Sequence, residues 1–206
     1  MKTAGIYLAA GTSRRMGTDK RSLFLNGVSL GSMALKNALL SELDHIFVIT
    51  RKGDSLHWLS DVFFLSPISN KWSQAECEQA GKGQGHSIQC GLQKAAAYEA
   101  DAVIILLADQ PFVTSDIINT LIDSYQKERR YLFIAAENQH LPMPPILFSN
   151  QCFPVLHQLK GDQGARHVIR ESMINMGKMI SFQDPLLFYD VDTVEDYTLL
   201  LNKFGE

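Results

Sequence analysis

An uninterrupted apolar run near the middle of the chain limits the possible fold most. The segment AVIILLA, at 102–108, has seven consecutive apolar residues, with Asp101 before it and Asp109 directly after it. A strand with one solvated face alternates apolar and polar residues, whereas a strand buried on both faces does not. Strands of the second kind belong to parallel sheets that helices cover on both sides. Residues 101–109 therefore predict a central strand of an α/β domain.

The segments around this run alternate between strand and helix patterns. Strands are predicted at 5–10, 45–50, 63–67, 131–137, 179–183 and 186–192, with a further extended piece after the prolines at 142–145. Helices are predicted at 29–43, 55–62, 86–99, 114–130, 150–159, 163–173 and 193–204. The polar segment 69–85 is predicted to be a long loop. This alternation predicts a three-layer α/β/α fold with a mainly parallel, mixed sheet, and residues 1–206 are expected to form a single domain.

Composition excludes several classes of protein. Hydrophobic residues make up 46% and charged residues 20% of the chain, which is enough apolar material for a buried core. The net charge of −3 gives no support for binding nucleic acid, so any anion site must be local. The apolar stretch at the start is too short for a signal peptide, and no segment is long enough to span a membrane. We expect a cytoplasmic protein with no membrane partner.

The three cysteines are far apart and form no CxxC pair. A zinc site is therefore not expected. The odd number and the lack of framework spacing are typical of a reducing compartment, in which Cys77, Cys90 and Cys152 would be buried or incidental thiols.

A glycine-hinged basic loop follows the first predicted strand. In LAAGTSRRMGTDK the strand stops at Gly11, and Arg14, Arg15 and Lys20 follow within nine positions. Glycine allows a tight turn whose backbone N–H groups face one anion, and arginine and lysine bind phosphate groups. The spacing is that of neither a Walker A loop nor a GxGxxG motif. The sequence predicts a phosphate-binding loop, and a solvated basic loop is the alternative.

Three aspartates are candidate metal ligands. Asp109 ends the central strand, where ligands of parallel sheets bind, and Mg²⁺ typically uses one or two carboxylates together with substrate phosphates. Asp190 and Asp192 lie on either side of Val191 in a predicted strand, so both carboxylates would point to the same face. Together with Asp109 they would complete a metal site. The alternative is structural, because Asp109 can cap a turn, and Asp192 with Thr193 can cap the last helix.

The segment LKGDQGARHVI, at 159–169, has glycines on either side of a turn and an arginine early in the next helix. It is a candidate substrate-binding loop, or else a plain connection between helices. The six histidines have no metal-ligand spacing, and no GxSxG motif provides an acyl-transfer nucleophile.

Taken together and in order, these motifs resemble those of the MobA-like nucleotidyltransferases. LAAGTSRRMGTDK is similar to the family's signature loop, LADQPFV to its metal-binding strand end, and LKGDQGARHVI and DVDTVED to elements of the branch that modifies the molybdenum cofactor. The members that serve xanthine dehydrogenase in purine catabolism are the most similar. The resemblance implies a Rossmann-like nucleotidyltransferase fold and transfer of CMP from CTP to the molybdopterin cofactor, with pyrophosphate released.

The resemblance also implies roles for individual residues. Arg15 and Lys20 would be the catalytic cations, and Mg²⁺ would bind Asp109 and one of Asp190 and Asp192. The substrate-binding residues would be Gly161, Asp162, Gly164 and Arg166. The nucleotide would be bound by Leu8, Ala9, Ala10, Gly11, Thr12, Ser13, Arg15, Lys20, Gly85 and Ser87. The partners implied are CTP, the molybdopterin cofactor and, transiently, a molybdenum hydroxylase.

Two features bear on specificity. The family has LAAG where the base is cytosine and LAGG where it is guanine, and a side chain at Ala10 would crowd a purine. The segment 69–85 looks longer than the family's usual link and is interpreted as an insertion that forms a lid or a docking surface. The alternatives are transfer to a sugar or polyol phosphate on the same fold, and a non-catalytic carrier of the molybdenum cofactor.

Overall fold

The computed structural model describes residues 1–11 and 16–205. Within these residues, a seven-stranded sheet has the order β5-β4-β1-β6-β8-β7-β9, and a separate hairpin is formed by β2 and β3. The strands of the sheet are β1 (Thr3–Leu8), β4 (His45–Arg51), β5 (Trp72–Cys77), β6 (Ala102–Leu107), β7 (Phe133–Asn138), β8 (Leu141–Ser149) and β9 (Gly177–Ser181). Only β8 runs antiparallel to its neighbours β6 and β7 among these described pairings, so the predicted mainly parallel, mixed sheet is confirmed.

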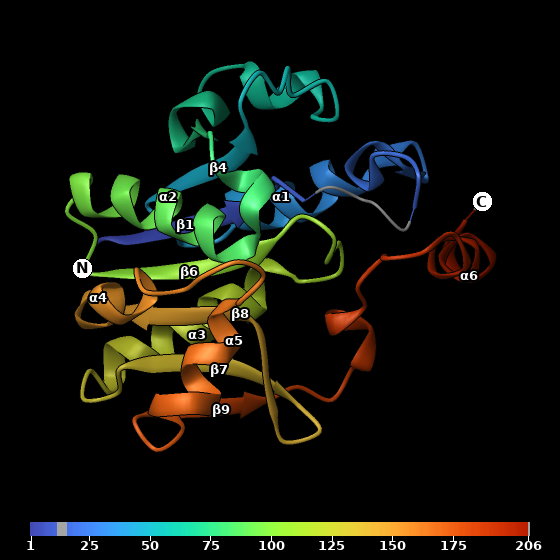
Figure 1. The fold of residues 1–206 in the computed structure, drawn as a ribbon. Helices are drawn as coiled ribbons and strands as arrows, with labels where there is room; N and C mark the ends of the chain where they lie inside the picture. Colours follow the sequence, from blue (N-terminus) through green and yellow to red (C-terminus); the bar gives the residue numbers. More distant parts are fainter. Residues whose placement is uncertain (12–15, 206) are drawn as a thin grey trace.

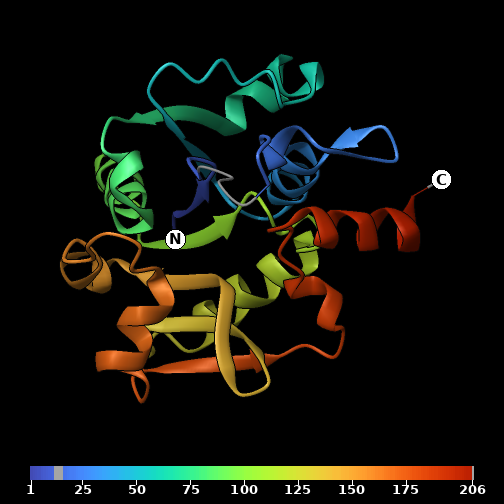
Figure 2. The same cartoon turned by 45° about the vertical axis from the view of Figure 1, so that its right-hand side comes forward.

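Helices cover both faces of the sheet, as Figures 1 and 2 show. One face packs against α1 (Leu30–Leu40) and α3 (Ser115–Lys127), and the other packs against α2 (Gln84–Ala97), α4 (Phe153–Leu156) and α5 (Ala165–Val168). The helix α5 continues as a π-helical turn at Ile169–Met173. The predicted three-layer arrangement is confirmed.

The central strand β6 is buried, as its run of apolar residues predicts. Five of its six residues are buried, and β1 and β8 flank it on either side. Because β1 runs parallel to β6 in register from Thr3 opposite Ala102 to Leu8 opposite Leu107, the two strands end together. Gly11 and Asp109 are consequently at the same edge of the sheet.

The last helix, α6 (Val194–Phe204), lies apart from the sheet and next to the hairpin of β2 (Phe24–Leu25) and β3 (Val28–Ser29). Thr193 caps it as predicted, in a reciprocal capping box with Asp196. The Tyr197 hydroxyl donates a hydrogen bond to the Phe24 carbonyl at 2.6 Å, which ties the helix to the hairpin. No helix in residues 1–11 and 16–205 is long and apolar enough to cross a membrane.

The predictions between β4 and α2 are wrong. Residues 55–60 are irregular chain with one turn and one bend instead of a helix, and the expected strand at 63–67 belongs to a 3-10 helix (Asp61–Phe64) and to the bend and turn after it. The edge of the sheet is formed instead by β5, which lies within the segment expected to be a loop. In β5, Ala75 and Cys77 pack into the core beside α2, and this burial outweighs the polar residues Ser73, Gln74 and Glu76 of the same strand.

Two other expectations need correction. The strand predicted at 186–192 is a 3-10 helix (Pro185–Phe188) followed by irregular chain, because Pro185 starts a helical turn that Asp184 caps. Cys77 and Cys90, expected to be separate thiols, form a disulfide between β5 and α2, with their Cα atoms 5.9 Å apart. Cys152 is a free, buried thiol, as expected.

Candidate active site

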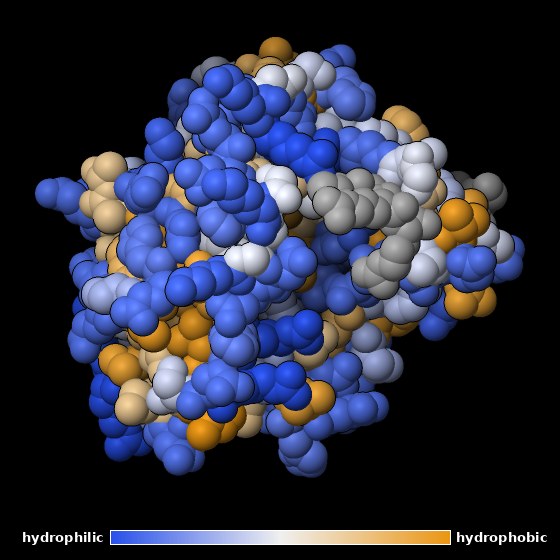
Figure 3. Space-filling model, viewed as in Figure 1, coloured by the Kyte–Doolittle hydropathy of each residue, from blue (hydrophilic) through white to orange (hydrophobic). Residues whose placement is uncertain are grey.

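A pocket of about 560 Å³ lies at the edge of the sheet where β1 and β6 end. This is the edge at which open parallel sheets bind their ligands. In Figure 3 the surface is hollowed near the centre of the view, and hydrophilic residues predominate around the hollow. The residues that line the pocket are Leu8, Ala9, Ala10, Gly11, Lys20, Arg21, Ala80, Gly81, Lys82, Gly83, Gln84, Ser87, Leu107, Ala108, Asp109, Asp162 and Asp192.

Lys20 connects two carboxylates at this edge. Its ammonium donates to the Asp109 carboxylate and, at 2.9 Å, to the Asp192 carboxylate. The Lys20 side chain is 14% exposed. Burial opposes its charge, but Asp109 and Asp192 outweigh the burial, so the pKa of Lys20 is raised. Lys20 is therefore held as a cation inside the pocket.

The backbone brings Asp192 to Asp109. The Val191 N–H donates to the Asp109 carbonyl at 3.2 Å, and Val191 itself is fully buried. Asp192 and Asp190 therefore lie on either side of an anchored residue, although this segment is not a strand. Asp192 lines the pocket, whereas Asp190 does not.

Asp190 is more deeply enclosed than Asp192. Its Oδ1 atom is buried and has no hydrogen-bond partner among the described residues. Burial, reinforced by the nearby charge of Asp109 and then of Asp192, raises the pKa of Asp190 to about 6. The side-chain amide of Gln110 lies near Asp190 and favours the charged form of the Asp190 carboxyl group. The Gln110 Oε1 and Nε2 atoms nevertheless make no hydrogen bond of good geometry within the described chain.

The opposite side of the pocket is formed by Ala80–Gln84 and the start of α2. Gly83 precedes the helix with a φ of 121°, and Gln84 and Ser87 in the first helical turn face the pocket. The N-terminus of a helix carries unpaired N–H groups and a partial positive charge, which favour an anion. This side of the pocket therefore complements phosphate as well.

Glycines allow this side to pack closely against the loop at 160–164. The Gly85 N–H donates to the Gly161 carbonyl at 2.9 Å. A Cβ atom at Gly83 would lie 2.2 Å from the Gly161 carbonyl carbon, so no side chain fits there. Gly85, in the first turn of α2, thus binds the loop at 160–164 through Gly161, and neither glycine lines the pocket.

A second pocket, of about 700 Å³, adjoins the first. Gln84 and Asp162 line both pockets. Its other lining residues include Gly164 and Arg166 from the predicted substrate loop, and Arg170. The lining therefore contains two arginines, which can bind an anionic group, together with the carboxylates of Asp162 and Glu171.

The structure therefore brings together most of the predicted site residues. Those that line the first pocket are Leu8, Ala9, Ala10, Gly11, Lys20, Ser87, Asp109, Asp162 and Asp192. Gly164 and Arg166 line the second pocket, and Gly85, Gly161 and Asp190 line neither. The predicted Thr12, Ser13 and Arg15 lie outside the described residues. The functional roles assigned to all of them stay predictions.

Sequence reasoning missed Arg21 as a lining residue, whereas the segment 69–85, expected to border the base pocket, contributes Ala80–Gln84 to the lining. For the segment a signal was present, because three glycines occur in the five residues 81–85. For Arg21 no local signal is present, because its partners Ala9 and Asp54 are 12 and 33 positions away in the sequence.

The carboxylates offer oxygen ligands of the kind that Mg²⁺ prefers. Asp109 and Asp192 both contact the one ammonium of Lys20, and Asp190 Oδ1 is buried without a hydrogen-bond partner among the described residues. No group of three or more acidic, histidine or cysteine side chains in the described parts of the chain is arranged to hold a metal ion. Asp109 and Asp192 fit as a pair that a cation shares with substrate phosphates.

Comparisons with known proteins agree with this geometry. The family profile described as "MobA-like NTP transferase domain" matches residues 5–176. The chain is 40% identical to the "Purine catabolism protein PucB" of Bacillus subtilis over 197 residues, which cover 95% of this chain and 94% of that protein. It is 31% identical to a "Molybdenum cofactor guanylyltransferase" of Rhodobacter capsulatus over 121 residues, 59% of this chain and 58% of that one.

The fold is also that of a solved structure. The homologue of Mycobacterium tuberculosis rv0371c from Mycobacterium sp. strain JC1 superposes with a TM-score of 0.77 and 25% sequence identity. The match covers 99% of this chain and 98% of that chain.

Proposed function

The chain belongs to the MobA-like NTP transferase family, and we propose that it transfers CMP from CTP to the molybdopterin form of the molybdenum cofactor. The product would be the cytosine dinucleotide cofactor of a molybdenum hydroxylase such as xanthine dehydrogenase. Two relatives support this proposal by their names: PucB acts in purine catabolism, and the guanylyltransferase of Rhodobacter modifies the same cofactor.

The observation that carries the proposal is the position of Lys20. Its ammonium lies between Asp109 and Asp192, in the pocket that Gly11 and the N-terminus of α2 also line. Nucleotidyl transfer needs little covalent work from the protein and depends on positioning and charge stabilisation. Lys20 would neutralise the phosphates as negative charge moves onto the departing pyrophosphate.

The reaction joins two anions. A phosphate oxygen of the acceptor attacks the α-phosphorus of CTP, the bond from the α-phosphorus to the bridging oxygen breaks, and pyrophosphate leaves with that electron pair. The acceptor phosphate is already ionised and needs no strong general base, in keeping with a first pocket that has no histidine among its described lining residues. Asp109 and Asp192 would hold Mg²⁺, which when bound supplies further positive charge to the triphosphate.

The second pocket would receive the acceptor. Arg166 and Arg170 line it and provide positive charge for the phosphate of the cofactor. Because Gln84 and Asp162 line both pockets, donor and acceptor would meet at these two residues.

Cytosine is the base we propose. The Ala10 side chain is nearly buried and lies in the lining of the first pocket, where it would take space from a purine. One added methyl group discriminates only modestly between ligands, so we expect a preference and not an absolute choice.

The test is a measurement of pyrophosphate release from CTP and, separately, from GTP, with Mg²⁺ and molybdopterin cofactor supplied. We expect release with CTP and much less with GTP. Faster release with GTP would leave the mechanism intact but overturn the role of Ala10.

The same assay separates the alternatives. Release with a sugar or polyol phosphate, but not with molybdopterin cofactor, would show that the acceptor is wrong. No release with either nucleotide, while the cofactor binds, would show a carrier of the finished cofactor.

A further inference from the structure

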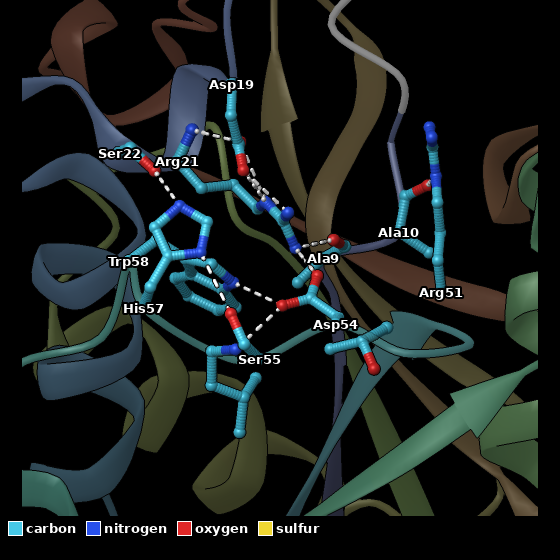
Figure 4. Close-up of polar contacts among 12 residues, drawn as sticks. Ala9, Ala10, Asp19, Arg21, Ser22, Arg51, Asp54, Ser55, His57 and Trp58 are labelled. Atoms are coloured by element: carbon cyan, nitrogen blue, oxygen red, sulfur yellow. Dashed lines mark hydrogen bonds and ion pairs between the residues drawn. The ribbon is translucent and has the colours of Figure 1, made fainter.

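Lys20 and Arg21 are neighbours in the chain, yet their side chains bind different partners. They begin a short 3-10 helix (Lys20–Ser22) that Asp19 caps by accepting a hydrogen bond from the Arg21 N–H. Lys20 extends to the carboxylates of Asp109 and Asp192. Arg21 extends to Ala9, at the end of β1, as Figure 4 shows.

The Arg21 guanidinium uses each of its three nitrogens. Nη1 donates to the Ala9 carbonyl and to the Asp54 carboxylate, each at 2.6 Å. Nε and Nη2 form a forked pair with the Asp19 carboxylate, at 2.9 and 2.7 Å. These donors point at protein acceptors, so Arg21 is not placed as a free phosphate clamp although it lines the pocket.

The partners of Arg21 are themselves held in place. The Asp54 carboxylate also accepts from the Leu56 N–H at 2.9 Å and from the Trp58 indole at 3.2 Å. Trp58 is 2% exposed, and its ring lies 4.8 Å from the Arg21 guanidinium carbon. The network therefore rests on a buried part of the core.

A second arginine holds the next carbonyl. The Arg51 Nε atom donates to the Ala10 carbonyl at 3.0 Å. Two successive peptide groups at the end of β1 are thus bound from the side by arginines that come from different elements. Without these two contacts, the chain at the adjacent Gly11 would have the wide conformational freedom of a glycine.

We propose that Arg21 is a positioning residue with two roles. Through Ala9 it fixes the start of the predicted phosphate-binding loop, and through the 3-10 helix it holds Lys20 against Asp109 and Asp192. The expected effect on turnover rests on the proposed function. The claim that Arg21 sets the position of Lys20 does not. A planar fork satisfies Ala9, Asp54 and Asp19 at once, which a lysine cannot do.

The first experiment measures the position of Lys20 without any substrate. Wild-type protein and R21K are acetylated with a limiting amount of acetic anhydride, and the modification of each lysine is quantified by mass spectrometry. Lys20 is protected in the wild type because it is ion-paired and 14% exposed. We expect Lys20 to be modified several times faster in R21K. The matched control is R130K, the same change at a residue whose side chain is 73% exposed.

The second experiment measures steady-state pyrophosphate release from CTP for the same proteins. We expect kcat of R21K to fall about 10- to 100-fold, with little change in KM, because a small displacement of a catalytic group slows the reaction by such factors. R130K should retain wild-type values. If R21K does not fold, D19N is the second variant, because asparagine still caps the 3-10 helix but weakens the forked pair.

The outcomes are distinct. Unchanged modification of Lys20 in R21K and D19N overturns the proposal, and so does faster modification with an unchanged kcat. If the wild type releases no pyrophosphate from CTP, the proposed function fails, and the rate of Lys20 modification alone decides whether Arg21 positions Lys20.

Discussion

Two sides of the same pocket are stabilised by different physical means. The ion-held side consists of Ala9–Gly11 with Lys20 and Arg21, where charged side chains bind carboxylates and a backbone carbonyl. The glycine-packed side consists of Ala80–Gln84, which lies against the backbone of the loop at 160–164. The first side depends on charge, and the second depends on the absence of side chains. A perturbation of charge and a perturbation of volume should therefore affect different sides.

The largest effect should come from the ion-held side. We expect K20A to lower kcat for pyrophosphate release by about 100- to 1,000-fold, which is the usual cost of removing a group that stabilises charge in the transition state. KM for CTP should change much less. Steady-state kinetics test this, with K52A as the control because the Lys52 side chain is 70% exposed. Equal turnover in K20A would remove Lys20 from the mechanism.

Reduction of the disulfide should affect the glycine-packed side next. The bond joins Cys77 to Cys90, which are 13 positions apart in the sequence, and the segment that it closes includes Ala80–Gln84. Closing a loop of this size stabilises a protein by about 3 kcal/mol. Urea unfolding with and without dithiothreitol should show such a loss of free energy. The double variant C77S/C90S should give the same urea unfolding curve with and without dithiothreitol. A wild type whose unfolding curve does not change with dithiothreitol would contradict the stabilising role of the disulfide.

A single methyl group should then distinguish two glycines of one loop. Gly83 has a φ of 121° and lies against the Gly161 backbone, whereas a Cβ atom at Gly81 would meet nothing within 4 Å. We expect G83A to lower the free energy of unfolding by about 2 kcal/mol or more, from backbone strain alone. G81A should leave it nearly unchanged. Equal stabilities of the two variants, measured by urea unfolding, would show that the close packing has no energetic weight.

The smallest effect should appear in acid. Burial opposes the charge of Asp19, but Arg21 outweighs it, so the pKa of Asp19 lies below its ordinary value of 3.8. A carboxyl group with a lowered pKa adds stability that is present above its unfolded pKa and disappears as the pH falls through the folded one.

The difference in unfolding free energy between wild type and D19N should therefore be constant near neutral pH and shrink below about pH 4. Urea unfolding at a series of pH values measures this difference. A difference that grows in acid would contradict the pairing with Arg21.

The fold was predictable where local pattern and burial agree. The apolar run at 102–108 identified the central strand, and Thr114 and Thr193 marked the starts of α3 and α6. The edge strand β5 was missed because its alternating polar residues resemble a loop. Only the neighbouring strand β4 and the helix α2 make that segment a strand, and neither contact is local in sequence.

The site was predictable where chemistry follows directly after a strand. Gly11 and Asp109 were found in this way because β1 and β6 end together. Arg21 was missed since its partner Asp54 is 33 residues away, and the Cys77–Cys90 pair was missed because spacing alone cannot show that two elements touch. Long-range pairs of this kind require the fold.

The contact between Gly83 and Gly161 connects the two pockets, so it bears on whether binding at one pocket affects binding at the other. One glycine borders the first pocket, and the other belongs to the loop that also supplies Asp162 to both pockets. Because the contact is backbone against backbone, no rotamer can absorb a movement of either loop. If a ligand in one pocket moved either loop, the other loop would have to move with it, so binding at the two pockets would be coupled, and thermodynamic reciprocity would make the effect equal in both directions. The two glycines would then transmit this coupling through the backbone and not through side chains.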